Sequence, residues 1–365
     1  MLRLLNIAMF IVPGLFSTII HDYLRHGENK IKKKVTLFAL YLCIINTISF
    51  VVSYLRGVKE FRFSDMTMSY RLKYISLGIV LGFVVPFIVC LLTEDIITIG
   101  GFIRYGKRTV RDFRKYMAYA IWAAKSDLGA EVASSFLNWL WWLIEPFFMM
   151  LIYTVIFGYV FKAKEKYFPI FIFTGLTMWG FFSRSINGSV DTVRNGKDII
   201  TKVYMPKYIL LLSKMFVNGF KMMVSFGVIF LMMIVYRVPI SWNLIWVIPI
   251  LFIMFLFTFG VGIIMMHYGV YVNDLGYITG IVLQMMMYLS GVFYSLAKRI
   301  PDPFGEILEK FNPVACFMSA MRSALIYRST PSLAILAVWT FISLILIALG
   351  IFTIYSNENS YVKVI

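Results

Sequence analysis

The residues that come nearest to a chemical motif are Gly101, Gly106, Lys107 and Arg108. They nearly match the phosphate-binding loop G-x-x-x-x-G-K-[ST], in which the final hydroxyl ligates magnesium and a strand precedes the loop. Here Arg108 takes the place of the hydroxyl, and an apolar run of helical length precedes the motif. We therefore expect that this chain binds no nucleotide.

His267 is a second candidate for chemistry, because it lies inside an apolar run. An intramembrane histidine can act as a base or relay protons. Asp274 follows two turns later, near the end of the predicted helix, and no nucleophile accompanies the pair. The three cysteines lie far apart and form no C-x-x-C pair, so they indicate no metal site. We predict a packed, hydrogen-bonded His267, with no catalytic or metal-binding residue in the chain.

A third candidate is an aromatic stretch around one carboxylate, Glu145. This glutamate lies about two turns into an apolar run, where a charge is costly unless it faces water, a partner or a bundle interior. The following Pro146 permits a kink. Clustered tryptophans form either an interfacial belt or a stacking surface at a channel entrance. The candidate lining of a substrate pathway, on the cytoplasmic side, is Trp139, Trp142, Glu145, Phe147 and Tyr153.

These candidates lie on a series of long apolar runs. Each run is close to the ~20 residues that cross ~30 Å of hydrocarbon as a helix. Hydrophobic residues make up 60% of the 365 residues, and a backbone in lipid must satisfy its own hydrogen bonds, which favours helices. The sequence thus predicts an all-α polytopic membrane protein. The runs are 4–20, 35–55, 75–92, 138–160, 168–186, 208–236, 244–270, 277–296 and 332–355.

Charge divides the chain into three parts. The net charge of +17 is explained by loop cations that face anionic lipid headgroups, so membrane lipids are expected partners and nucleic acid is not. The basic stretch 104–115 is assigned to the cytoplasm by the positive-inside rule. Residues 1–100 are then an N-terminal membrane extension of two or three spans. Residues 101–136 are a cytoplasmic basic segment with an amphipathic interface helix, and 137–365 form a six-span core.

Five local patterns follow one another along residues 112–365. They are a tryptophan-rich run ending in Glu145-Pro146, PIFIFTGLTMWGFF at 169–182, NGKDIITKVYMPK at 195–207, Tyr271-Val-Asn-Asp274, and Ser290-Gly-Val-Phe-Tyr-Ser295 followed by Asn312-Pro313 and Arg322. In this order they resemble the membrane subunit of ABC-2-type exporters, in the polysaccharide and teichoic-acid (O-antigen-like) branch. Two positions depart from the family pattern: Gly129-Ala130-Glu131 replace basic residues, and Asn273-Asp274 replaces Arg-Asp. The N-terminal extension is also unusual for the family.

The resemblance implies a homodimeric permease of the bacterial plasma (inner) membrane that exports a lipid-linked glycan. A separate cytoplasmic ABC ATPase would bind ATP and magnesium, and this chain would bind no cofactor. Residues 195–207, called the coupling segment below, would dock on that ATPase. The implied contacts are Ile199, Lys202, Tyr204 and Pro206, with Asp274 at the end of the fourth core span.

Other functions remain open at this point. The same fold could export a smaller amphiphile or a drug. A polytopic acyl- or glycosyltransferase with His267 as base would need a convergent set of acid, base or metal-binding groups, which the sequence does not contain. A non-catalytic membrane scaffold is the remaining alternative.

Overall fold

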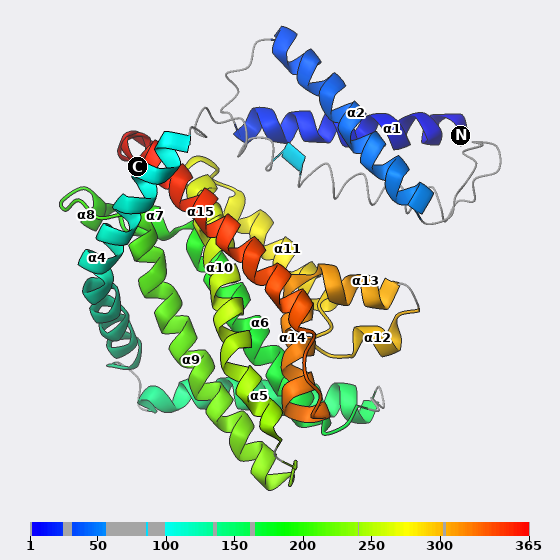
Figure 1. Cartoon of the computed structure of the whole chain (residues 1–365), viewed down its shortest axis with the longest axis vertical. Helices are drawn as coiled ribbons and strands as arrows, with labels where there is room; N and C mark the ends of the chain where they lie inside the picture. The colour runs from blue at the N-terminus through cyan, green and yellow to red at the C-terminus, as the bar shows by residue number, and fades with distance from the viewer. Residues whose placement is uncertain are drawn as a thin grey trace. The chain divides into compact units, whose positions relative to one another are not determined.

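The computed structural model of the chain describes residues 2–24, 31–55, 85–86, 99–133, 137–160, 165–239, 241–301 and 304–364. The regular structure of these ranges is helical, as the apolar runs predict (Figure 1). The chain divides into two compact units, residues 1–101 and 102–365.

The first unit contains two packed helices, α1 (Leu2–Leu24) and α2 (Ile31–Leu55). The fully buried Tyr41 of α2 belongs to its small apolar core. Its hydroxyl lies 2.6 Å from Nδ1 of His21 on α1, so both buried polar groups have a partner, as an apolar setting requires. The predicted apolar run at 75–92 lies outside the described residues, except for 85–86.

The second unit is a helical bundle, and α4 begins at its boundary with the first unit. Its helices are α4 (Ile99–Ala133), α5 (Trp141–Tyr153), α6 (Phe168–Val190), α7 (Thr192–Asn195), α8 (Lys197–Ile200), α9 (Lys207–Val235), α10 (Val247–Tyr271), α11 (Leu275–Leu289), α12 (Leu296–Arg299), α13 (Phe304–Phe311), α14 (Pro313–Arg322) and α15 (Leu333–Val364). Short 3-10 or π-helical segments adjoin α5, α10 and α14; they are Asn138–Leu140, Thr154–Val160, Trp242–Trp246 and Ser323–Tyr327.

Four helices of the described chain are long and apolar enough to cross a membrane, which confirms the all-α polytopic fold. They are Trp141–Gly158, Lys207–Val235, Trp242–Tyr271 and Leu333–Glu358. The other two predicted core spans differ from this pattern. Helix α6 has 23 residues, but polar residues such as Arg184 and Asn187 lower its hydropathy. Helix α11 has 15 residues, or about 22 Å at 1.5 Å per residue; the chain turns at Gly291, whose φ of 67° suits glycine.

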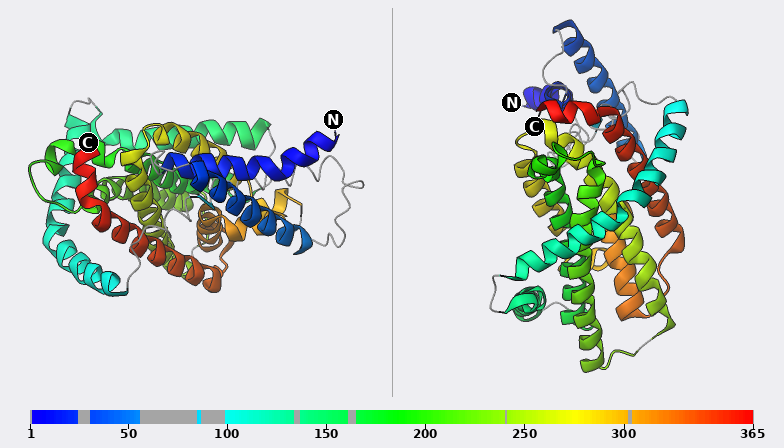
Figure 2. Two further views of the ribbon diagram at one scale, coloured as in Figure 1. Left: turned by 90° about the horizontal axis from the view of Figure 1, so that it is seen from above. Right: turned by 90° about the vertical axis from the view of Figure 1, so that its left-hand side faces the viewer.

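Helix α10 lies at the centre of this bundle. It packs against α15, α6 and α9, and these helices run side by side in Figures 1 and 2. The α10 side chains of Ile250, Met254, Ile263 and Met266 are fully buried. Ile250 and Met254 lie on one face of the helix, and Ile263 and Met266, nine to sixteen residues further on, lie on roughly the opposite face. Helix α10 is therefore enclosed by neighbours on more than one side.

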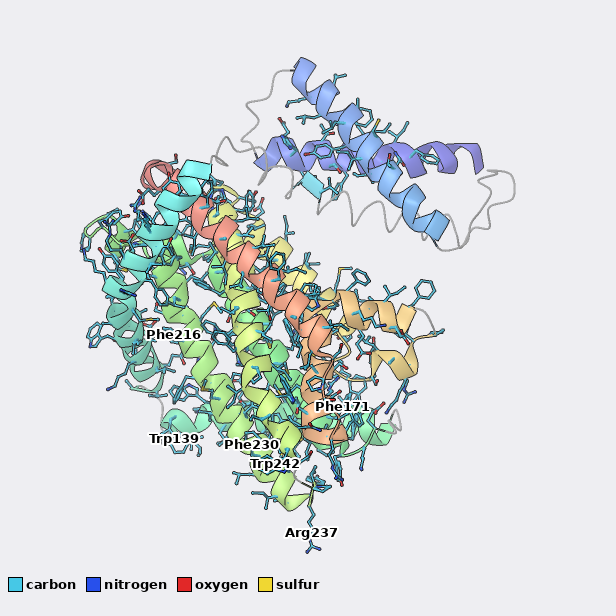
Figure 3. All side chains as sticks on the ribbon, viewed as in Figure 1. Trp139, Phe171, Phe216, Phe230, Arg237 and Trp242 are labelled. Carbon is cyan, nitrogen blue, oxygen red and sulfur yellow. The ribbon has the colours of Figure 1, made fainter. Side chains whose placement is uncertain are left out.

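The two ends of the bundle differ in what they carry. The coupling segment, the start of α4 and the last turns of α15 lie at one end, called the coupling end (Figure 1). Arg237 and Trp242, in the connection from α9 to α10, lie at the opposite end (Figure 3). Helix α5 runs across the bundle near that opposite end, crosswise to α9 and α10 in both views (Figures 1 and 2).

Candidate functional site

The coupling segment folds as a turn that leads into α9. The one-turn helix α7 leads into it, and the one-turn helix α8 lies within it. Pro206 is buried and stands immediately before α9, with an extended backbone conformation. Proline suits this position because a helix start leaves its first N–H groups without intrahelical partners. Pro206 therefore begins α9 and does not offer a surface for contact, unlike its predicted role.

The other predicted contact residues of the coupling segment are exposed. Ile199 is 40% exposed and Tyr204 51%, and Val203 between them is 57% exposed. Lys202 is exposed beside them. Exposed apolar and aromatic side chains that are grouped together are typical of interaction surfaces. The structure thus places three of the predicted residues on one accessible surface.

Arg108 of α4 lies at the centre of a polar network around Tyr204. Its Nη2 donates to the two carboxylate oxygens of Glu358 at 2.9 and 3.1 Å and also to the Tyr204 hydroxyl. That hydroxyl donates to Glu358 at 3.1 Å. Hydrogen bonds between ionised groups are stronger than neutral ones. The network therefore joins α4, the coupling segment and α15.

The charges of this network are fixed by its own geometry. Burial works against the Arg108 cation, but the hydrogen bond and charge of Glu358 raise the pKa of Arg108 above its ordinary value. Burial and the Glu358 carboxylate raise the pKa of Tyr204, so the phenol stays protonated and can donate. The three groups hold complementary charge and hydrogen-bonding capacity at neutral pH.

Tyr355 of α15 packs against the Arg108 side of this network. The Arg108 guanidinium carbon lies 4.4 Å from the centre of its ring, a cation–π distance. The Tyr355 hydroxyl donates to the buried Asp112 carboxylate at 2.9 Å and lies 3.1 Å from the Tyr208 hydroxyl. The buried Asp112 therefore has a hydrogen-bond donor, as a buried carboxylate requires.

His267 lies at the same end and is packed, as predicted. Its Nδ1 is 2.6 Å from the Tyr361 hydroxyl, and both side chains are buried. Just beyond, Arg194 of α7 donates to Asn273 at 2.6 Å. This bond brings the exposed Asp274 next to the residues that precede the coupling segment.

The near-match to a phosphate-binding loop lies within a helix. Gly101 and Gly106 are both part of α4. A phosphate-binding loop needs a turn whose backbone N–H groups point at the phosphate, whereas these N–H groups lie within an α-helix. The segment instead supplies Arg108 to the network described above.

The predicted pathway residues are spread along α5 and its flanks. Trp139 lies in the 3-10 turn before α5 and is 57% exposed. Trp142 is half-buried on α5, with its ring 5.8 Å from that of Phe220 on α9. Glu145 is exposed. The two tryptophans therefore lie on consecutive elements, the 3-10 turn and α5.

The far end of this stretch lies against the turn after α11. The Tyr153 ring is 4.9 Å from that of Phe293, and Phe147 packs against the core between the two ends. Since α5 crosses near the end that carries Trp242, the pathway residues and the coupling segment occupy different regions of the bundle (Figures 1 and 3). The prediction that both lie on the cytoplasmic side is therefore wrong for one of them.

Arg322 is the buried cation of this second region. It is only 5% exposed and donates to the carbonyls of Gly291 and Val292, each at 2.8 Å, and of Phe171 at 3.2 Å. Its guanidinium lies 3.5 Å from the centre of the Phe171 ring. Within the described chain, Arg322 has no ion pair. One side chain thus ties α6, the turn after α11 and α14 together.

Comparison with known proteins shows which family this helical arrangement resembles. Residues 130–326 match the family described as ABC-2 type transporter. The O-antigen export system permease protein RfbA of Myxococcus xanthus is 26% identical over 216 residues, which cover 59% of this chain and 83% of that protein. RfbA of Klebsiella pneumoniae is 28% identical over 226 residues, covering 62% of this chain and 86% of that protein. The family match begins within α4 and ends just after α14.

Proposed function

This chain belongs to the ABC-2 type transporter family, and we propose that it is the permease of an exporter for a lipid-linked cell-envelope polysaccharide. It is a multi-pass protein of the bacterial inner membrane. The observation that carries the proposal is the similarity to two O-antigen export permeases over 83% and 86% of their lengths. A glycan needs such a protein because its hydroxyl groups find no hydrogen-bond partners in hydrocarbon.

The energy source in this proposal is a separate cytoplasmic ABC ATPase, which binds ATP and magnesium. Its docking site is the exposed surface of Ile199, Lys202 and Tyr204, with Asp274 alongside. This assignment is supported by the exposure of Ile199, Val203 and Tyr204 on a turn. Tyrosine is also enriched among the residues that dominate binding energy at interfaces. The ring of Tyr204 would fill a cleft, while its hydroxyl stays bound within this chain.

The pathway in this proposal runs along α5 between two copies of the chain. Most of α5 is exposed or half-buried, and its exposed Glu145 would be costly against lipid. A polar pathway or a second copy removes that cost. Trp139, Trp142, Phe147 and Tyr153 supply aromatic faces that suit the C–H surfaces of sugars, and Glu145 accepts hydrogen bonds from hydroxyls. The transported polymer is a polysaccharide or a teichoic-acid-like chain.

Affinity purification together with deletion of the gene tests the proposal. The tagged chain should retain one ABC ATPase during purification. Deletion of the gene for this chain should cause lipid-linked polymer to accumulate on the cytoplasmic side. Restoring the chain should return the polymer to the cell surface. Efflux of small amphiphilic dyes, measured in the same cells, should not change. Normal surface polymer in the deletion strain, or loss of dye efflux alone, would contradict a polysaccharide exporter and favour a small-amphiphile exporter.

A further inference from the structure

The last turns of α15 present three polar side chains at intervals of three residues. They are Tyr355, Glu358 and Tyr361, and residues three apart lie on neighbouring positions of a helix surface. Tyr355 contacts Asp112 of α4, Glu358 contacts Arg108 of α4 and Tyr204 of the coupling segment, and Tyr361 contacts His267 of α10. One short stretch of helix therefore contacts three separate parts of the bundle.

These contacts have the burial and geometry of a positioning device. Tyr355 is 3% exposed and Tyr361 is fully buried, so their hydrogen bonds lie in a setting of low dielectric, where polar contacts are strong and specific. Between them, the Glu358 side chain is 17% exposed and that of Arg108 is 26% exposed. Tyr355 and Tyr361 are therefore held in buried positions, and Glu358 lies between them, where the coupling segment meets water.

The backbone bonds at the tip of the coupling segment run from Lys202 and Val203 to Ile199, within the segment itself. Lys202, Val203 and Tyr204 are all exposed, and the Tyr116 hydroxyl of α4 donates to the Tyr204 carbonyl at 3.1 Å. A turn pushed by a partner would bend unless its side chains were tied to the bundle. The Tyr204 hydroxyl supplies that tie through Arg108 and Glu358.

We infer that Tyr355, Glu358 and Tyr361 form a clasp, the α15 clasp, that holds the coupling segment to α4 and α10. The clasp passes movement of the segment into the bundle. This inference rests on the proposed function, because the movement comes from a docked ATPase. Arg108 and Glu358 are positioning residues in it, since they act on the segment through Tyr204.

A charge swap tests the clasp. We expect Arg108→Glu and Glu358→Arg to lower the amount of polymer exported per ATP hydrolysed by about tenfold each, which corresponds to about 1.4 kcal/mol. The double variant restores an opposite-charge pair and should recover most of that loss. The matched control is Arg114→Glu, an exposed arginine on the same helix. The ratio is measured in proteoliposomes that contain the chain and the ATPase co-purified with it, at equal amounts of complex.

A second measurement does not depend on transport. Hydrogen exchange of residues 197–206 in the purified chain, without ATPase, should be faster in either single variant than in wild type or Arg114→Glu, and should slow again in the double variant. Unchanged exchange and an unchanged export ratio in both single variants would overturn the clasp. So would single variants that lose export without rescue in the double variant. If the wild-type chain binds no ATPase, the proposed function fails, while the exchange experiment still decides whether the clasp holds the segment.

Discussion

Arg108 and Arg322 bury a guanidinium in two different ways at two regions of the bundle. Arg108 keeps 26% of its side chain exposed and pairs with the Glu358 carboxylate at 2.9 Å. Arg322 is 5% exposed and bonds to three backbone carbonyls, with no ion pair in the described chain. Arg108 thus forms an ion pair that water can reach, whereas Arg322 is a cation enclosed by the dipoles of backbone carbonyls.

The difference indicates what each region is built to do. An ion pair at the edge of the bundle loses less when it is disturbed, because water can replace part of the lost contacts. A buried cation held by carbonyls has no such replacement, and removing either side leaves groups unsatisfied. The coupling end can therefore shift as a unit without leaving a buried group unpaired, whereas the Arg322 region holds α6, α14 and the turn after α11 in fixed positions.

The strongest test of this comparison is to truncate both arginines. Arg322→Ala removes the side-chain donor of the Gly291 and Val292 carbonyls in the turn after α11, at roughly 1–3 kcal/mol for each buried group left unsatisfied, so much of the folded protein should be lost. Arg108→Ala should lower stability less, because Glu358 keeps some access to water and the buried Asp112 keeps its donor Tyr355. The measurement is the thermal midpoint of the detergent-solubilised chain, followed by fluorescence-detected size-exclusion chromatography. Equal losses in the two variants would remove the distinction between the regions.

Gly175 provides a milder test of the fixed region. A Cβ at this position would lie 2.6 Å from Nη2 of Arg322 and 2.9 Å from the Val292 carbonyl oxygen. Gly175→Ala should therefore displace the guanidinium and destabilise the chain by about 1–3 kcal/mol, as overpacking does. The control is Gly188→Ala on the same helix, where a Cβ meets nothing within 4 Å. That change should be neutral or stabilise by up to about 1 kcal/mol, and a similar loss in both variants would contradict the role of Arg322.

At the coupling end, substitutions of Tyr204 should change transport and leave folding intact. Tyr204→Asp removes the exposed ring and places a second carboxylate beside Glu358, so export should fall by about tenfold or more, since 1.4 kcal/mol is tenfold. Tyr204→Phe keeps the ring and removes the hydroxyl bonds, worth roughly 0.5–1.5 kcal/mol, so a loss of a few-fold is expected. Export is measured as surface polymer per folded permease. Normal export by Tyr204→Asp would argue against docking at this surface.

The sequence predicted the parts of this structure that depend on local composition. The runs at 208–236 and 332–355 correspond to α9 and α15, because long apolar stretches must form helices in lipid. The run at 277–296 was predicted as one span, but the helix ends at Leu289. Its apolar residues continue past a glycine turn, and hydropathy does not detect a turn made of Gly291, Val292 and Phe293.

The contacts between distant residues could not be predicted in this way. Tyr204 was expected on the docking surface, but Arg108 and Glu358 lie 96 and 154 residues away from it in sequence. The available signal was Glu358 itself, a lone carboxylate at the end of a long apolar run. Arg322 was part of a family pattern, but its partners could not be predicted. They are backbone carbonyls, which every residue type has, so the sequence does not identify them.

The smallest expected effects lie on α5, which contacts neither arginine through the bonds described above. The Trp142 ring packs against Phe220, and Glu145 is exposed, so neither residue supports the core. Trp142→Ala and Glu145→Gln should each reduce export by a few-fold, consistent with the ~0.5–1.5 kcal/mol of an aromatic contact, at an unchanged amount of folded permease. Trp142→Phe separates a pathway from a lipid belt. A stacking role predicts that phenylalanine retains more export than alanine, whereas a belt predicts that both variants export normally. Unchanged export in Trp142→Ala and Glu145→Gln together would exclude this face of α5 from the pathway.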